Sequence, residues 1–146
     1  MSNTSGRAAH QLYFHLVWTT RDRRPMIDGA TASWLDRFFR RTAINERVEV
    51  IELAILRTHV HIIVRTSERL DLGRLAQMLK GGSSYAASRL PENKVGLRWA
   101  REYSASTVSP SRLRAAIDYL KRQGQRHPDE VVTTRPSGLR RAEHTL

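Results

Sequence analysis

The chain has 146 residues, with 25 lysines and arginines against 14 aspartates and glutamates, so its formal net charge is +11. Hydrophobic residues make up 40% of the chain, enough for one core, which excludes a disordered polyelectrolyte. Cysteine is absent, which excludes disulfides, thiolate zinc sites and cysteine nucleophiles.

The first half of the chain predicts three strands and one helix. Residues 11–20 alternate between two sets of side chains, as in a strand with two different faces, and His15 lies on one of them. An amphipathic helix is expected over 30–45. Residues 48–56 and 58–66 are rich in β-branched side chains and nearly adjacent, which predicts two antiparallel strands joined by a tight turn.

A second helix is expected over 71–89. Its two central glycines, Gly81 and Gly82, would each cost about 1 kcal/mol in a helix interior. Either the helix kinks there, or close approach by another backbone or a ligand compensates. Residues 98–108 then predict a fourth strand.

The third helix is expected to open with Ser109 as N-cap and Pro110 at its first position, and to stop at Gly124. The element order matches an α+β, ferredoxin-like (split βαβ) fold: a four-stranded antiparallel sheet with two helices on one face and an otherwise open second face. We expect one domain over 8–127 and a flexible basic tail over 128–146.

His59 and His61 are two residues apart on a predicted strand, so their imidazoles point to the same face. Neighbouring core residues on this strand point the other way, which leaves the histidines on the face away from the two helices. Two neutral imidazoles at this spacing can share one divalent cation. A His-x-His pair is also common by chance, and a purely structural role is the alternative.

Tyr119 and Gln123 are four residues apart and would lie on one stripe of the third helix. The tyrosine could act as a nucleophile, and the glutamine could ligate a cation or orient a substrate. The alternative for Tyr119 is packing beside the apolar side of the same helix.

The positive charge is carried almost entirely by arginine, since the only lysines are Lys80, Lys94 and Lys121. The planar fork of arginine suits bidentate phosphate contacts, so a phosphate polymer is the first partner to consider. No apolar run could span a bilayer and the start of the chain lacks an apolar signal segment, so we expect a cytoplasmic protein without a membrane partner.

These residues together resemble the single-tyrosine HUH transposases, which include the insertion-sequence class 200/605 and the REP-associated tyrosine transposases. The resemblance runs from about residue 10 to 127 and rests on the histidine pair and on four further segments: YFHLVWTTRDRRP, LKGGSSY, WAREYSASTVSPS and IDYLKRQ. It implies a Mg²⁺ or Mn²⁺ cofactor, a homodimer, and single-stranded DNA with hairpin ends as substrate.

The resemblance also implies a role for individual residues. His59, His61 and Gln123 would be metal ligands, and Tyr119 would be the nucleophile, on a C-terminal helix lying over the second face of the sheet. Attack on a scissile phosphate would leave a 5′-phosphotyrosine and a free 3′-hydroxyl, so that a second strand can be joined during transposition. In this family an Asp or Asn often precedes the first histidine, whereas this chain has Thr58 there.

Other residues are candidates for a part in the same chemistry. His15 is expected near the substrate, and Tyr103 and Tyr85 could stack on a base or, as alternatives to Tyr119, act as the nucleophile. DNA contacts are expected from five basic residues: Arg21, Arg23, Arg24, Lys80 and Arg122.

Two other functions remain open from the sequence. A ferredoxin-like sheet with exposed aromatic side chains is also typical of non-catalytic RNA- or DNA-binding modules. A domesticated REP-associated transposase, which cleaves hairpin DNA without moving its own gene, would carry the same residues.

Overall fold

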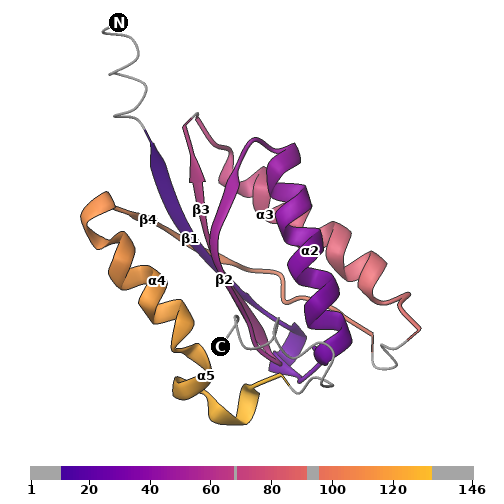
Figure 1. Cartoon of the computed structure of the whole chain (residues 1–146). Helices are drawn as coiled ribbons and strands as arrows, with labels where there is room; N and C mark the ends of the chain where they lie inside the picture. Colours follow the sequence, from indigo (N-terminus) through magenta and orange to yellow (C-terminus); the bar gives the residue numbers. More distant parts are fainter. Residues whose placement is uncertain (1–10, 68, 92–95, 133–146) are drawn as a thin grey trace, which may run out of the picture.

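The computed structural model describes residues 11–67, 69–91 and 96–132 (Figure 1). Its longer elements are β1 Leu12–Thr19, α2 Gly29–Asn45, β2 Glu49–Ile55, β3 His59–Thr66, α3 Leu72–Ala87, β4 Ser104–Val108, α4 Leu113–Lys121 and α5 Gln123–Arg126. Short 3-10 turns lie at Arg21–Arg23, Pro110–Arg112 and Pro128–Glu130. Within these ranges no helix is long and apolar enough to cross a lipid bilayer.

The four strands form one antiparallel sheet in the order β2-β3-β1-β4. This is the strand order of a split βαβ fold, so the predicted ferredoxin-like architecture is confirmed. β1 and β3 are the central strands, and their register pairs Val17 with His61 and His15 with Ile63. His15 and His61 are therefore diagonal neighbours on one face of the sheet.

The main core lies between one face of the sheet and the layer formed by α2 and α3 (Figure 1). It contains the alternate side chains of the two central strands that the period-two pattern assigned to this face. Each of the four elements contributes fully buried residues: Leu16 and Trp18 from β1, Val60, Ile62 and Val64 from β3, Leu35 and Phe39 from α2, and Leu75 and Leu79 from α3.

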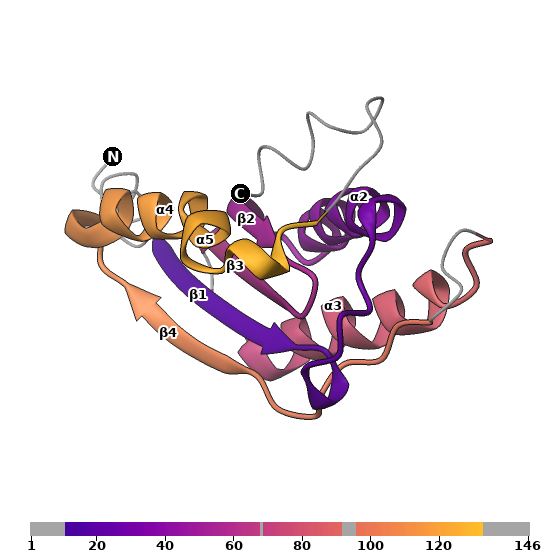
Figure 2. The ribbon, with the colours of Figure 1, turned by 90° about the horizontal axis from the view of Figure 1, so that it is seen from below.

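A second, smaller core covers the other face of the sheet. Ala54, Leu56 and Ile63 from the sheet side pack against Leu120 of α4. Figure 2 shows α4 and α5 lying along this face, with α3 on the opposite side. The C-terminal helix therefore closes the face that would otherwise be open, as the family resemblance implied.

The fourth strand is shorter than predicted. Residues 98–108 contribute only β4, from Ser104, and an isolated bridge between Trp99 and Thr20. The ammonium of Lys80 donates to the carbonyl oxygens of Arg101 and Glu102, at 2.8 and 3.1 Å. These carbonyls bond to α3 instead of extending the strand ladder, which explains the late start of β4.

The second predicted helix forms as one continuous helix, whereas the third predicted helix is divided into two. α3 runs through its glycines without a break, and a Cβ on Gly82 would come within 2.8 Å of Cζ of Phe38 on α2, so close helix packing explains this glycine. The third helix was predicted to run unbroken to about Gln123, which is wrong. α4 ends at Lys121, Arg122 has φ −97° and ψ 8°, and Gly124 lies inside α5 instead of ending a helix.

The first residues of the predicted tail are packed against the domain. Val132 is 3% exposed and belongs to the main core, and the backbone N–H of Arg57 donates to the carbonyl of Glu130 at 2.9 Å. Residues 128–132 are therefore not part of a flexible tail. The remainder of that predicted tail, 133–146, lies outside the described residues.

Candidate active site

The two histidines of β3 lie side by side beneath α4 and α5. His59 and His61 are 4% and 5% exposed, and their ring centroids are 5.1 Å apart. The strand pleat sends both imidazoles to the same face, while α4 and its apolar side chains exclude water from above. The pair is thus buried rather than exposed on an open sheet.

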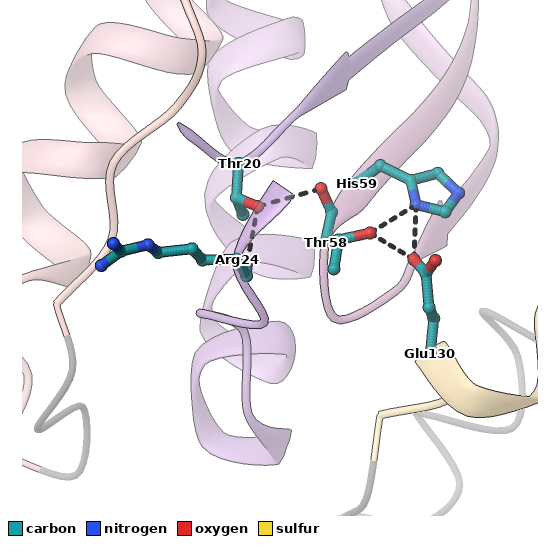
Figure 3. Close-up of polar contacts among 5 residues, drawn as sticks. All are labelled: Thr20, Arg24, Thr58, His59 and Glu130. Atoms are coloured by element: carbon teal, nitrogen blue, oxygen red, sulfur yellow. Dashed lines mark hydrogen bonds and ion pairs between the residues drawn. The ribbon is translucent and has the colours of Figure 1, made fainter. Parts of the chain in front are cut away.

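The Nδ1 atom of each of these imidazoles lies within hydrogen-bond distance of a polar atom. Nδ1 of His61 lies 3.1 Å from Nε2 of His15 on β1. Nδ1 of His59 lies 3.0 Å from Oε1 of Glu130 and 3.1 Å from Oγ1 of Thr58 (Figure 3). The Nε2 atom of each ring is then the nitrogen left to bind a cation.

Burial and mutual repulsion keep the histidines neutral. Burial, with the neighbouring charges of His59, His15 and His127, lowers the pKa of His61 to about 3. Burial also lowers the pKa of His15, and it outweighs the charge of Glu130 in lowering the pKa of His59. Neutral imidazole is the form that binds metal ions, so the site favours ligation at neutral pH.

Tyr119 reaches the same cluster from α4. Its ring centroid lies 5.6 Å from that of His61 and 6.2 Å from that of His15, both edge-on. The guanidinium of Arg126 lies 5.1 Å from the tyrosine ring centroid. One chain therefore supplies both the tyrosine and the histidines.

Gln123 is fully buried at the start of α5. Its Nε2 donates to the backbone carbonyl of Tyr119 at 3.4 Å, while its Oε1 has no hydrogen-bond partner among the described residues. The Gln123 side chain raises the pKa of His59 and His61 against the larger effect of burial, as an amide oxygen facing them would do. A buried acceptor without a hydrogen-bond partner lowers the stability of the fold unless a bound ligand, such as a cation, interacts with it.

These donors fit a divalent cation. Two imidazole nitrogens and one amide oxygen form a mixed set that a first-row ion such as Mn²⁺ accepts, with water or phosphate oxygens in the remaining positions. No cluster of three or more His, Cys, Asp or Glu side chains in the described ranges could hold a metal ion. The amide of Gln123 is thus essential to any three-ligand set here.

Three of the predicted candidate residues lie away from the histidine cluster. Tyr103 precedes β4 rather than lying within a strand, and it lies near Lys80 and Gly73 of α3, the layer opposite α4. Lys80 donates to backbone carbonyls, which gives it a role within the fold. Tyr85 is also on α3, 66% exposed, with Arg89 over its ring.

The arginines predicted to contact DNA are all exposed. Arg21 and Arg23 lie in the 3-10 turn after β1, and Arg24 follows it. The charge of Arg23 lowers the pKa values of both His59 and Glu130, which puts this guanidinium at the edge of the cluster. Figure 3 shows the Arg24 side chain pointing away from His59. Arg122 is exposed at the break between α4 and α5.

Sequence reasoning missed three residues of the cluster: Arg126, His127 and Glu130. Arg126 lies seven residues after Tyr119, and that spacing is a helical signal that could have found it. The ring of His127 lies 5.2 Å from that of His59. Glu130 fell in the predicted tail, and Thr58 in place of an acidic residue had only put a carboxylate contribution in doubt, so no sequence signal pointed to Glu130.

Comparison with known proteins identifies relatives of the whole domain. A family model described as "Transposase IS200 like" matches residues 8–123. The ISDra2 transposase TnpA of Deinococcus radiodurans is 27% identical over 119 residues, covering 78% of this chain and 85% of the relative.

Two solved structures are also similar. A protein described as a transposase from Deinococcus radiodurans R1 has a TM-score of 0.60 at 25% identity, covering 77% of this chain and 91% of the other. A REP-associated tyrosine transposase bound to a REP hairpin has a TM-score of 0.65 at 16% identity, covering 80% and 68%, and supports the fold. The family match spans more than half of the chain and includes the histidines, Tyr119 and Gln123, so the chain belongs to the IS200-like transposase family.

Proposed function

We propose that this transposase is a metal-dependent endonuclease and strand transferase of single-stranded DNA that acts through a covalent 5′-phosphotyrosine at Tyr119. The proposal rests on one observation: the Tyr119 ring lies 5.6 Å from that of His61, a buried neutral histidine. The His15 imidazole and the Arg126 guanidinium also lie around the Tyr119 ring, which gives it more polar neighbours than a tyrosine that only fills the core requires.

Attack by a tyrosine keeps the energy of the broken phosphodiester in a new bond between the tyrosine oxygen and phosphorus. Oη of Tyr119 forms a bond to the scissile phosphorus, and the bond from phosphorus to the 3′-oxygen breaks. The phenol loses its proton, and the departing 3′-oxygen gains one. Attack by a 3′-hydroxyl of another strand then reverses the sequence and frees the tyrosine, so rejoining needs no ATP.

His59, His61 and Gln123 would hold a Mg²⁺ or Mn²⁺ ion through Nε2 of each ring and Oε1 of the amide. When bound, the ion supplies Lewis-acid polarisation of the scissile phosphate. The three side chains are themselves buried, and Gln123 donates to the backbone carbonyl of Tyr119, which ties it to the residue that carries the phenol. Arg126 favours the negative charge that develops on the tyrosine oxygen during attack.

We propose single-stranded DNA with hairpin ends as the substrate, in the cytoplasm of a bacterial or archaeal cell. The similar REP-associated transposase carries a REP hairpin, and the exposed arginines after β1 suit phosphate contacts. A homodimer would bring two DNA ends together for joining.

A non-catalytic RNA-binding module is less well supported. Such modules stack bases on the open face of the sheet. Here α4 covers that face, and the side chains beneath it are buried histidines and aliphatic residues. The choice between a mobile and a domesticated element depends on the repeats that flank the gene.

The direct test is a covalent adduct. Labelled single-stranded hairpin DNA incubated with the protein and Mn²⁺ should give a band of reduced mobility on a denaturing gel. Tyr119→Phe should abolish this band, while Tyr85→Phe, a matched change on the opposite layer, should keep it. An adduct that persists in Tyr119→Phe overturns the nucleophile assignment.

A further inference from the structure

The Glu130 side chain is held against the first histidine of the pair. Its Oε1 accepts hydrogen bonds from the hydroxyl of Thr58 and, at 3.0 Å, from the His59 imidazole at Nδ1 (Figure 3). The ionised carboxylate of a glutamate can only accept hydrogen bonds, so Thr58 and His59 are both donors to Glu130.

The backbone around Glu130 fixes the carboxylate in this position. The Glu130 carbonyl accepts from Arg57 N–H at 2.9 Å, and the Glu130 N–H donates to the carbonyl of His127 at 2.9 Å. Two residues later, Val132 is buried in the main core. The segment is thus pinned on both sides of Glu130, next to the turn that leads into β3.

A carboxylate at this place determines which nitrogen of His59 carries the proton. An anionic acceptor 3.0 Å from Nδ1 requires a proton on Nδ1, and a neutral ring then has its lone pair on Nε2. The two nitrogens lie on opposite sides of the ring, so the Glu130 oxygen bound at Nδ1 is not a ligand of a cation at Nε2.

We propose that Glu130 is a positioning residue of the metal site: it fixes the tautomer and the ring orientation of His59 so that Nε2 faces the cation. This inference rests on the proposed metal-binding function of the histidine pair. A carboxylate that accepts a hydrogen bond from the non-ligating nitrogen of a metal-binding histidine typically contributes 10–100-fold to metal affinity. Glu130 supplies this carboxylate from the 3-10 turn after α5, and Thr58, which donates to it, occupies the position just before His59.

The test compares Glu130→Ala, Glu130→Gln and a matched control, Asp129→Asn. Asp129 is exposed in the same segment, so its change removes the same charge without touching the histidines. Mn²⁺ affinity of the metal-free full chain is measured by titration calorimetry, and the His59 tautomer by long-range ¹H–¹⁵N correlation NMR. Thermal unfolding shows that each variant is folded.

We expect His59 to carry its proton on Nδ1 in the wild type and in Asp129→Asn, and to become a mixture of tautomers in Glu130→Ala. Mn²⁺ affinity should fall by about 10–100-fold in Glu130→Ala and by less in Glu130→Gln, which keeps an acceptor oxygen. If Glu130→Ala does not fold, Glu130→Gln gives the same comparison with a smaller expected loss.

Two results would overturn the inference: a proton on Nε2 of His59 in the wild type, or Mn²⁺ affinity unchanged in both Glu130 variants. The proposed metal site fails in a different way, since His61→Ala would then leave Mn²⁺ affinity unchanged. The tautomer is measured without metal, so it decides the role of Glu130 in either case.

Discussion

His15 on β1 and His61 on β3 meet diagonally across the sheet, with Nε2 of the first 3.1 Å from Nδ1 of the second. Their rings are stacked, with centroids 5.3 Å apart. One ring donates an N–H to the bare nitrogen of the other, so the contact forms between two neutral rings and is lost when both are protonated. The histidine cluster is therefore sensitive to pH.

The first prediction concerns stability against pH. Unfolded imidazoles bind protons near pH 6.5, whereas folded His61, with its pKa lowered to about 3, does not. The unfolded state thus binds more protons in this window, so the free energy of unfolding is greatest above about pH 6.5 and falls as the pH drops towards 3. Each such histidine contributes a slope of about 1.4 kcal/mol per pH unit.

Urea unfolding at pH 7.5, 6 and 5 measures this slope while most carboxylates stay ionised. His61→Asn should unfold with a shallower dependence on pH than the wild type. A free energy of unfolding that is flat between pH 7.5 and 5 would contradict the buried neutral cluster.

The second prediction separates stability from activity at Gln123. Gln123→Met keeps the side-chain volume and removes a buried acceptor without a hydrogen-bond partner, a defect that costs about 1–3 kcal/mol. Thermal stability should stay the same or rise, while Mn²⁺-dependent cleavage is lost. Gln123→Ala is the control, since its cavity should destabilise the protein. Full cleavage by Gln123→Met would show that the amide oxygen has no part in the reaction.

The third prediction concerns Arg126, whose guanidinium lies over the Tyr119 ring. Arg126→Ala should slow single-turnover cleavage by about tenfold at saturating DNA, because a nearby cation stabilises the negative charge that develops on the tyrosine oxygen during attack. Arg126→Lys keeps the charge and should lose less. Arg114→Ala removes an exposed arginine of α4 and should leave cleavage at the wild-type rate; an equal loss there would indicate a general charge effect.

The fourth prediction distinguishes the adjacent glycines of α3. A Cβ on Gly81 would meet nothing within 4 Å, so Gly81→Ala should stabilise the helix by about 1 kcal/mol. Gly82→Ala should be neutral or destabilising, because its Cβ would press on Phe38, whose ring stacks on Trp34 with centroids 4.9 Å apart. Urea unfolding of the two variants measures the difference; equal stabilisation would mean that the Phe38 ring moves freely.

The fifth prediction addresses the exposed arginines after β1. Replacing Arg21, Arg23 and Arg24 by alanine should weaken hairpin binding and make the affinity less dependent on salt. The logarithmic slope should decrease by about 0.7–0.9 for each phosphate that these arginines neutralise in the wild type. The control replaces Arg37 and Arg41, which lie on α2 in the opposite layer, and the effects of the two variants are compared per charge removed. Equal effects in the two variants would indicate binding to the net charge alone.

Much of the fold was predictable because it depends on local periodicity. The alternation in residues 11–20 and the His-x-His spacing each determine which side chains share a face, and the structure has those faces as predicted. The late start of β4 was not predictable, since it depends on the bonds of Lys80 to carbonyls about twenty residues away.

The sequence predicted the parts of the candidate site that depend on the spacing of residues within one element. It did not predict the parts that depend on contacts between residues far apart in the chain. His59 and His61 share a face because residues two apart in any strand point to the same side of the sheet. Tyr119 and Gln123 meet the histidines through two helices with a break between them, although one helix was predicted. Glu130 reaches Thr58 across 72 positions of the sequence, and no local pattern carries that information.

The burial of Val132 affects where this domain can be cut. The family match ends at residue 123, but the hydrophobic interior is completed nine positions later by a valine that is 3% exposed. A fragment trimmed to the family boundary would lack that valine and the carboxylate behind His59. Studies of a minimal catalytic unit should therefore retain the chain through residue 132, because loss of activity in a shorter fragment would reflect an incomplete interior.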